Sequence, residues 1–194
     1  PMTYRVPIAT RTAAACLLAA ALQAGATGQN VLYTFNGTAA GVELGKSVSG
    51  AGDVNADGFA DLIAGARLAD VNGTDSGSAT VYSGLDGTIL FTVYGDSAFD
   101  LFGYAVRDAG DVNKDGFADV IVGAPFDDDG GSDAGSARVF SGVDGSILFT
   151  FHGVTANSQF GAAVNRAGDV NADGFPDVIV GAPQPGIGTG YFEV

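Results

Sequence analysis

The stretch "DVNKDGFADVIVGAP", residues 111–125, joins an acidic loop to a continuous apolar run, and it decides the fold. The acidic part occurs twice more, as "DVNADGFAD" at 53–61 and as "DVNADGFPD" at 169–177. Successive copies begin 58 residues apart. A fixed period of this length is typical of a chain built from repeated supersecondary units.

Each repeat predicts four short strands. In the second repeat we expect them at 102–106, 120–125, 136–141 and 146–151. The second of these is apolar throughout, as in a strand buried on both faces. Asp144-Gly145 predicts a hairpin turn before the fourth strand. Four antiparallel strands per repeat is typical of a β-propeller blade. A solenoid is the alternative, but solenoid repeats are usually shorter.

The two ends of the repeat region predict further strands. Residues 31–35 read as a fourth-type strand, and residues 191–194 as a possible third-type strand. With the two complete repeats, this predicts an all-β fold of about three blades. Closed propellers have roughly 4–8 blades, so we expect an open or incomplete propeller and a fragment of a longer one. Its exposed apolar flanks would favour self-association.

The N-terminal segment, residues 1–26, reads as a secretory signal peptide. Two arginines precede the apolar stretch 13–22, and Ala24-Gly25-Ala26 follows it. A buried helix is the alternative interpretation. We expect export and cleavage near Ala26, which leaves residues 27–194 as the repeat domain. No other segment is a candidate for membrane insertion.

The composition limits the classes of partner. The net charge is −14, which argues against nucleic acid and anionic membranes, because both require basic patches. The hydrophobic fraction of 46% argues against a disordered acidic tail. The acidic balance is compatible with bound cations.

The repeated loop has the pattern of a calcium site. Carboxylate or amide side chains stand at positions 1, 3, 5 and 9, glycine at position 6, and a phenylalanine carbonyl is available at position 7. This alternation resembles the EF-hand calcium loop, and ligands that are all oxygen favour Ca²⁺ over zinc or copper. The predicted ligands, for up to three Ca²⁺ ions, are Asp53, Asn55, Asp57, Phe59, Asp61, Asp111, Asn113, Asp115, Phe117, Asp119, Asp169, Asn171, Asp173, Phe175 and Asp177.

The loop departs from an EF-hand in one respect. Position 12 is Ala64, Val122 or Val180 instead of glutamate, so Asp at position 9 must supply the last carboxylate. The alternative interpretation is a set of Asx turns without metal, in which Asp and Asn accept backbone N–H groups. Lys114, at position 4, is expected to point outward.

Other polar groups give weaker signals. His152 has no partner that marks it as catalytic, and the serines lack the context of a nucleophile. Asp127-Asp128-Asp129 and Asp133 predict a solvated acidic loop, with a second cation site as the alternative. No catalytic cluster is evident.

The repeats resemble the FG-GAP repeat of integrin α-subunit propellers. The motif residues are Phe102-Gly103 with Gly123-Ala124-Pro125, and Phe160-Gly161 with Gly181-Ala182-Pro183. The first copy departs from the motif, with Leu44-Gly45 and Gly65-Ala66-Arg67. In glycine content the chain is similar to bacterial secreted proteins with tandem FG-GAP repeats.

The resemblance implies a calcium-bearing propeller that is secreted or lies at the cell surface. The expected function is a non-enzymatic module for extracellular recognition, adhesion or structure, with an extracellular protein or glycan as ligand. The alternative is the truncated propeller part of a secreted enzyme such as a polysaccharide lyase or a phospholipase.

Overall fold

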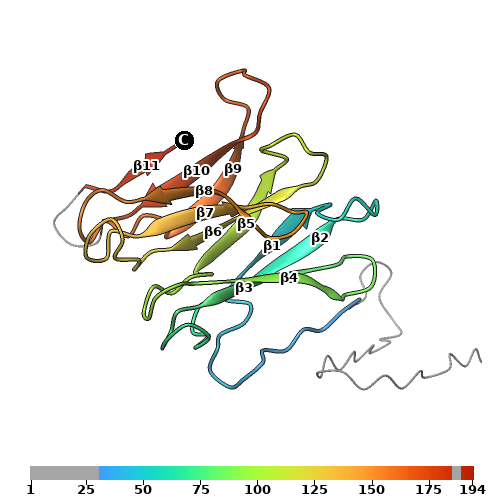
Figure 1. Cartoon of the computed structure of the whole chain (residues 1–194), viewed down its shortest axis with the longest axis horizontal. Helices are drawn as coiled ribbons and strands as arrows, with labels where there is room; N and C mark the ends of the chain where they lie inside the picture. The colour runs from blue at the N-terminus through green and yellow to red at the C-terminus, as the bar shows by residue number, and fades with distance from the viewer. Residues whose placement is uncertain (1–30, 185–188) are drawn as a thin grey trace, which may run out of the picture. The chain divides into compact units, whose positions relative to one another are not determined.

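The computed structural model describes residues 31–184 and 189–194, and residues 37–194 form one compact unit. Within the described residues there is no helix, and every strand belongs to one of three antiparallel sheets (Figure 1). That part of the chain accordingly contains no helix long and apolar enough to cross a membrane. The predicted signal peptide lies outside the described residues.

The sheets follow the chain in order, one per repeat. The first sheet contains β1 (Ser47–Gly52), β2 (Asp61–Ala66), β3 (Ser78–Tyr82) and β4 (Ile89–Tyr94). The second contains β5 (Ala105–Gly110), β6 (Asp119–Ala124), β7 (Ser136–Phe140) and β8 (Ile147–His152). The third contains β9 (Ala163–Gly168), β10 (Asp177–Ala182) and β11 (Tyr191–Glu193). Each sheet is a simple meander, which confirms the predicted all-β fold of incomplete propeller blades.

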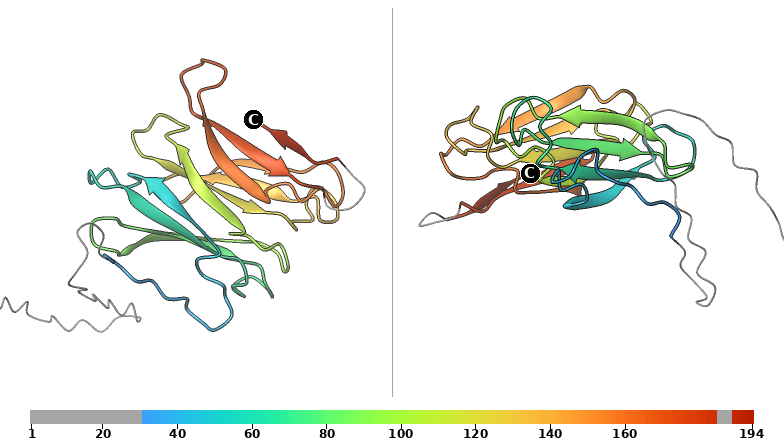
Figure 2. Two further views of the ribbon diagram at one scale, coloured as in Figure 1. Left: turned by 180° about the vertical axis from the view of Figure 1, so that it is seen from behind. Right: turned by 90° about the horizontal axis from the view of Figure 1, so that it is seen from below.

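The innermost strands of successive blades lie side by side. β5 contacts β1 on one side and β9 on the other (Figure 2). Each of these strands ends in a glycine at positive φ, where the pairing with the next strand shifts register: Gly52, Gly110 and Gly168. A glycine in the left-handed region is the usual way to make such a bulge. The bulge directs the chain into the acidic loop in the same way in all three repeats.

Two of the expected strands differ from the structure. The strand expected at 102–106 begins only at Ala105, because Phe102 instead forms a parallel bridge with Gly77 of the preceding blade. The prediction of a strand at 31–35 was wrong, since these residues belong to none of the three sheets. A strand-like sequence becomes a strand only when a neighbouring strand forms a ladder with it.

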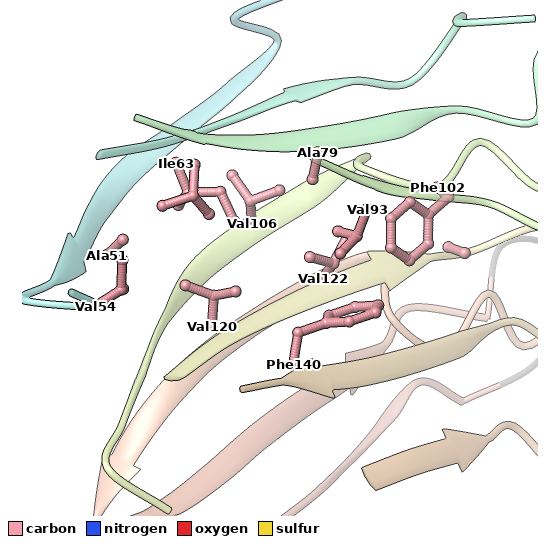
Figure 3. Packing of buried hydrophobic residues seen from close by; sticks show 12 residues of the cluster. Ala51, Val54, Ile63, Ala79, Val93, Phe102, Val106, Val120, Val122 and Phe140 are labelled. Atoms are coloured by element: carbon pink, nitrogen blue, oxygen red, sulfur yellow. The ribbon is translucent and has the colours of Figure 1, made fainter. Parts of the chain in front are cut away.

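The hydrophobic core lies between the blades. Ile63, Ala79 and Val93 of the first blade pack against the second blade, as Figure 3 shows. Along β6, Val120 and Val122 face the first blade, while Ile121 joins the core toward the third. The apolar run of β6, in the middle blade, is therefore buried on both faces, as its sequence predicts. In β2 and β10, which have a neighbouring blade on one side only within the described residues, the burial is partial.

A pair of glycines forms the joint between one blade and the next. A Cβ atom on Gly65 would lie 2.0 Å from the carbonyl oxygen of Gly103, and one on Gly123 would lie 2.0 Å from that of Gly161. Only glycine allows the two backbones to approach so closely. Phe102 and Phe160, which precede the second glycine of each pair, are fully buried between the blades. The Phe-Gly segment of one repeat and the Gly-Ala-Pro segment of the repeat before it thus form the joint between their two blades.

Candidate metal centre

The three acidic loops connect the first and second strands of their blades and lie next to one another. The backbone N–H of Ala118 in the second loop donates to the carbonyl of Asp53 in the first, at 3.0 Å. The Nζ of Lys114 lies 3.9 Å from the ring centroid of Phe175 in the third loop. Lys114 therefore leaves its own loop, as expected at position 4, but it contacts the neighbouring loop, a contact that the sequence did not predict.

Side chains within each loop hold the backbone in its curl. In the second loop, the Asp111 carboxylate accepts the backbone N–H groups of Asp115 and Gly116, each at 3.0 Å. Asn113 Oδ1 accepts the N–H of Asp115 at 3.0 Å, and Asp115 Oδ1 accepts that of Phe117 at 2.9 Å. The corresponding bonds occur in the first and third loops with lengths between 2.8 and 3.1 Å. The sequence repeat is thus also a repeat of conformation.

The curl requires two residues in the left-handed region. Position 4 has φ values of 55°, 58° and 60° at Ala56, Lys114 and Ala172. The glycine at position 6 has φ near 90°, which costs glycine little. A non-glycine residue in the left-handed region is uncommon and strained. The side-chain bonds of positions 1, 3 and 5 offset this strain.

The aspartate at position 9 has a second structural role. Asp119 is completely buried, and its carboxylate accepts the N–H of Val112 at 2.8 Å and that of Gly142 at 3.1 Å. Asp61 makes the same pair of bonds, to Val54 and Gly84. Gly142 and Gly84 follow the third strand of their blades, so this aspartate ties the loop to the next turn.

Asp177 is the position 9 aspartate of the third loop. It is half-buried and accepts the N–H of Val170 at 2.7 Å. Burial raises the pKa of Asp119 to about 6, an effect opposed by its two N–H donors and strengthened by the charges of Asp115 and Asp111. In the second loop, the charges of Asp111 and Asp115 thus disfavour the ionised form of Asp119.

The donor set of the loops fits a hard divalent cation. The side chains at positions 3 and 5 are exposed in all three loops, and that at position 1 is exposed or half-buried. Each oxygen that accepts one backbone N–H retains a second lone pair for a metal. Ligands of this kind, all oxygen and mostly anionic, suit Ca²⁺. The Asx turns of the alternative interpretation are present, and they leave these lone pairs available.

Among the described residues, two tighter groups of potential metal ligands lie at the other end of the second blade. Asp127, Asp129 and His152 form one group, and Asp96, Asp100 and Asp127 form the other, with ligand atoms within 4.8 Å of one another. These acidic clusters could hold a metal ion. They combine residues of the β4–β5 and β6–β7 connections with the last residue of β8.

The second group surrounds a buried arginine. Nη2 of Arg138, on β7, lies 2.8 Å from Asp96 Oδ2 and 3.1 Å from Asp127 Oδ2. Ser136 Oγ donates to the same oxygen of Asp127 at 2.5 Å. The expectation of a solvated loop was therefore wrong at Asp127, which is 2% exposed. The sequence did contain a signal for this buried ion pair. Arg138 is a basic residue on a third strand, where the first repeat has Thr80.

Charges in this group shift each other's pKa values. Burial raises the pKa of Asp100 to about 7, and the carboxylates of Asp127 and Asp96 add to the effect. Burial also acts to raise the pKa of Asp96, but the hydrogen bond and charge of Arg138 outweigh it and lower that pKa. The pKa of Asp100 is therefore raised while that of Asp96, in the same group, is lowered.

The sequence model of the FG-GAP repeat matches residues 45–82, 102–140 and 160–192, which together make up more than half of the chain. The chain is a member of the FG-GAP repeat family. Integrin alpha-5 of Xenopus laevis is 33% identical over 167 residues, which cover 78% of this chain and 16% of that protein. Integrin alpha-V of Gallus gallus is 32% identical over 167 residues, with the same coverage.

Human integrin alpha-6 is 39% identical over 99 residues, which cover 48% of this FG-GAP chain and 9% of that relative. The chain thus spans less than a fifth of the length of these curated relatives. The match to the repeat explains the joints between the blades: the Phe-Gly half of the motif is Phe102-Gly103 or Phe160-Gly161, and the Gly-Ala-Pro half begins at Gly123.

Proposed function

We propose that this FG-GAP chain is a calcium-binding propeller module that serves extracellular recognition, adhesion or structure. Each of the loops 53–61, 111–119 and 169–177 holds one Ca²⁺ ion. The ligands are the side chains at positions 1, 3, 5 and 9 and the carbonyl of the phenylalanine at position 7. The supporting observation is the loop conformation, which is the same in all three copies and leaves oxygen lone pairs at positions 1, 3 and 5 available.

Electrostatics gives the ion a structural role. Three aspartates lie in each loop, and the charges of Asp111 and Asp115 already raise the pKa of Asp119. A divalent cation removes this repulsion between carboxylates. Because position 9 also ties the loop to the turn after the third strand, bound Ca²⁺ would hold the first three strands of a blade together.

The recognition role rests on the family and its relatives. The similar curated proteins are integrin alpha subunits, and this similarity supports a location outside the cytoplasm, secreted or at the cell surface. In this proposal, residues 1–26 are the signal peptide and the ligand is an extracellular protein or glycan. The chain acts without catalysis, without nucleic acid and without membrane insertion.

Calorimetric titration with Ca²⁺ and Mg²⁺, together with melting curves, tests the calcium site. EDTA should lower the melting temperature, and Ca²⁺ should restore it better than Mg²⁺, whose small octahedral shell suits this loop poorly. At a hundredfold excess over Kd, one ion adds about 2.7 kcal/mol of stability. If no Ca²⁺ binding is found at millimolar concentrations, the Asx turns alone account for the loops.

Single substitutions show which loop binds the Ca²⁺ ion. Asp115→Ala should abolish binding at the second loop and leave the other two sites intact. Asp115→Asn should weaken binding less, because the amide keeps one oxygen ligand. Asp128→Asn is the matched control, since it removes a charge outside the loops and keeps the acceptor for the N–H of Asp133. Equal losses of Ca²⁺ affinity for the two Asn variants would contradict the assignment.

A further inference from the structure

Neighbouring acidic loops are joined in two different ways. Between the first and second loops the junction is a backbone hydrogen bond, from the N–H of Ala118 to the carbonyl of Asp53 at 3.0 Å. In the third loop the residue at the position of Ala118 is Pro176, which has no N–H to donate to the carbonyl of Asp111. The third loop therefore cannot join the second loop in the same way, and a different contact occurs there.

A lysine side chain makes the contact between the second and third loops. The Nζ of Lys114 lies 3.9 Å from the ring centroid of Phe175, and a Cβ atom on Gly174 would lie 3.0 Å from the same Nζ. The first loop has Ala56 at the position of Lys114, so it places no such charge on the second loop. Positions 1 to 7 of the first and third loops are identical in sequence. Lys114 thus gives the third loop an electrostatic environment that the sequence of that loop does not reveal.

The two residues beside the ammonium group belong to the proposed calcium site. The N–H of Gly174 donates to the carboxylate of Asp169 at 2.9 Å, and the N–H of Phe175 donates to that of Asp173 at 2.8 Å. Both carboxylates and the carbonyl of Phe175 are ligands in the proposed site. Lys114 is exposed, and none of the ion pairs among the described residues involves it. Its positive charge therefore lies close to the ligands of the third loop and is not taken up by an ion pair.

We propose that Lys114 lowers the affinity of the third loop for Ca²⁺, as a built-in cation that opposes the binding of the ion. This inference rests on the proposed function, in which the loop 169–177 holds Ca²⁺. Without Ca²⁺, the ammonium group offsets part of the repulsion between the carboxylates of the loop. When Ca²⁺ binds, a second cation enters beside the ammonium group, and the two positive charges repel each other. The third site then fills at a higher Ca²⁺ concentration than it would without Lys114.

The test measures the Ca²⁺ affinity of each loop separately in the full chain. Gly58, Gly116 and Gly174 stand at position 6, and the N–H of each donates to the aspartate at position 1 of its own loop. The resonances of these three amides in a nuclear magnetic resonance titration with CaCl₂ therefore report the three loops one by one. Each titration gives one Kd per loop.

Substitutions of Lys114 separate its charge from its packing. Lys114→Met removes the charge and keeps an unbranched stem over the ring of Phe175. The Kd reported by Gly174 should fall by about threefold or more, because the repulsion between nearby cations at a protein surface is lost. The gain at Gly116 should be smaller, and the Kd at Gly58 should not change. Lys114→Arg keeps the charge and should leave the Kd at Gly174 as it is in the native chain.

A matched control tests whether the gain is a general effect of net charge. Lys46→Met removes one positive charge from an exposed lysine that lies outside the acidic loops, so the net charge changes as it does in Lys114→Met. The Kd at Gly174 should stay unchanged in this variant. An equal gain in both variants would overturn the role of Lys114, because the overall charge of the chain would then account for it.

Ionic strength distinguishes charge repulsion from a change in packing. Salt screens exposed charges, with a Debye length of about 10 Å at 0.1 M. The ratio of the Kd values of the native chain and Lys114→Met at Gly174 should therefore shrink as KCl is added. A ratio that does not respond to KCl would assign the gain to the packing on Phe175 and would overturn the electrostatic role.

The same titrations distinguish failure of this inference from failure of the proposed function. If no loop binds Ca²⁺ at millimolar concentrations, the proposed function is wrong, and the role of Lys114 is wrong with it. If the first two loops bind Ca²⁺ and Lys114→Met does not tighten binding at Gly174, only the role of Lys114 is overturned. A larger gain at Gly116 than at Gly174 would also overturn it, because the charge would then act on its own loop.

Discussion

The two ends of the second blade are built on different principles. At the end of the acidic loop, the side-chain bonds of residues 111–119 have counterparts in the first and third repeats. At the other end, Arg138 and the aspartates around it have no such counterparts, because the first repeat has Ala69 and Thr80 at the positions of Asp127 and Arg138. A structural repeat can therefore be conserved at one end of a blade while the other end acquires its own chemistry.

Removing the buried cation should give the largest effect. Arg138→Met leaves the buried carboxylate of Asp127 without its cationic partner, which should lower the free energy of unfolding by about 3–5 kcal/mol. Urea denaturation measures the loss. The double variant Arg138→Thr with Asp127→Ala installs the residues of the first repeat and should recover most of the stability. A loss below about 1 kcal/mol for Arg138→Met would show that the pair is not effectively buried.

At the acidic-loop end, replacing the aspartate at position 9 should destabilise the protein more in the second repeat than in the third. Asp119→Ala leaves two N–H donors of the loop and turn without their acceptor, which should cost about 2–4 kcal/mol in EDTA, where no metal contributes. Asp177→Ala removes the acceptor of Val170 from a half-buried site and should cost about 1 kcal/mol. Equal losses in urea denaturation would mean that the tie to Gly142 contributes little.

The pH dependence of stability should reveal Asp100. Its pKa is about 7 in the folded chain and near 3.8 when unfolded, so the folded state binds the extra proton between these values. Stability should therefore fall as the pH rises from about 4 to about 7, and the loss should be complete above that range. Melting curves across this range at constant Ca²⁺ measure the slope. Asp100→Asn should reduce the slope, with the remainder due to Asp119, whose pKa is also raised. An unchanged slope would show that Asp100 does not contribute.

Removing the contact between the second and third loops should have the smallest effect on stability. Lys114 lies over the ring of Phe175, and its charge helps to lower the pKa of Asp173, after the hydrogen bonds from Phe175 and Asn171. Lys114→Gln should cost about 0.5–1 kcal/mol, as expected for an exposed cation–π pair. Ala56→Gln in the first loop is the control at the same position. Equal costs for both variants would show that the ring contributes nothing.

The sequence by itself determined the repeat, the fold class and the candidate loops. A period of 58 residues, apolar second strands and the glycines of the turns are local features, and local features specify blades and loop conformations without knowledge of distant contacts. The strand bounds of β6, β7 and β8 agree with the prediction to within a residue.

Only the tertiary structure decided which partners meet across distant parts of the chain. The strand predicted at 31–35 is absent because strand-like sequence requires a ladder, and the start of β5 shifted because Phe102 crosses to the preceding blade. The burial of Asp127 depends on Arg138, eleven residues further along the chain, and on Asp96 before it. Such pairs arise from packing between elements, and no periodicity in the sequence encodes them.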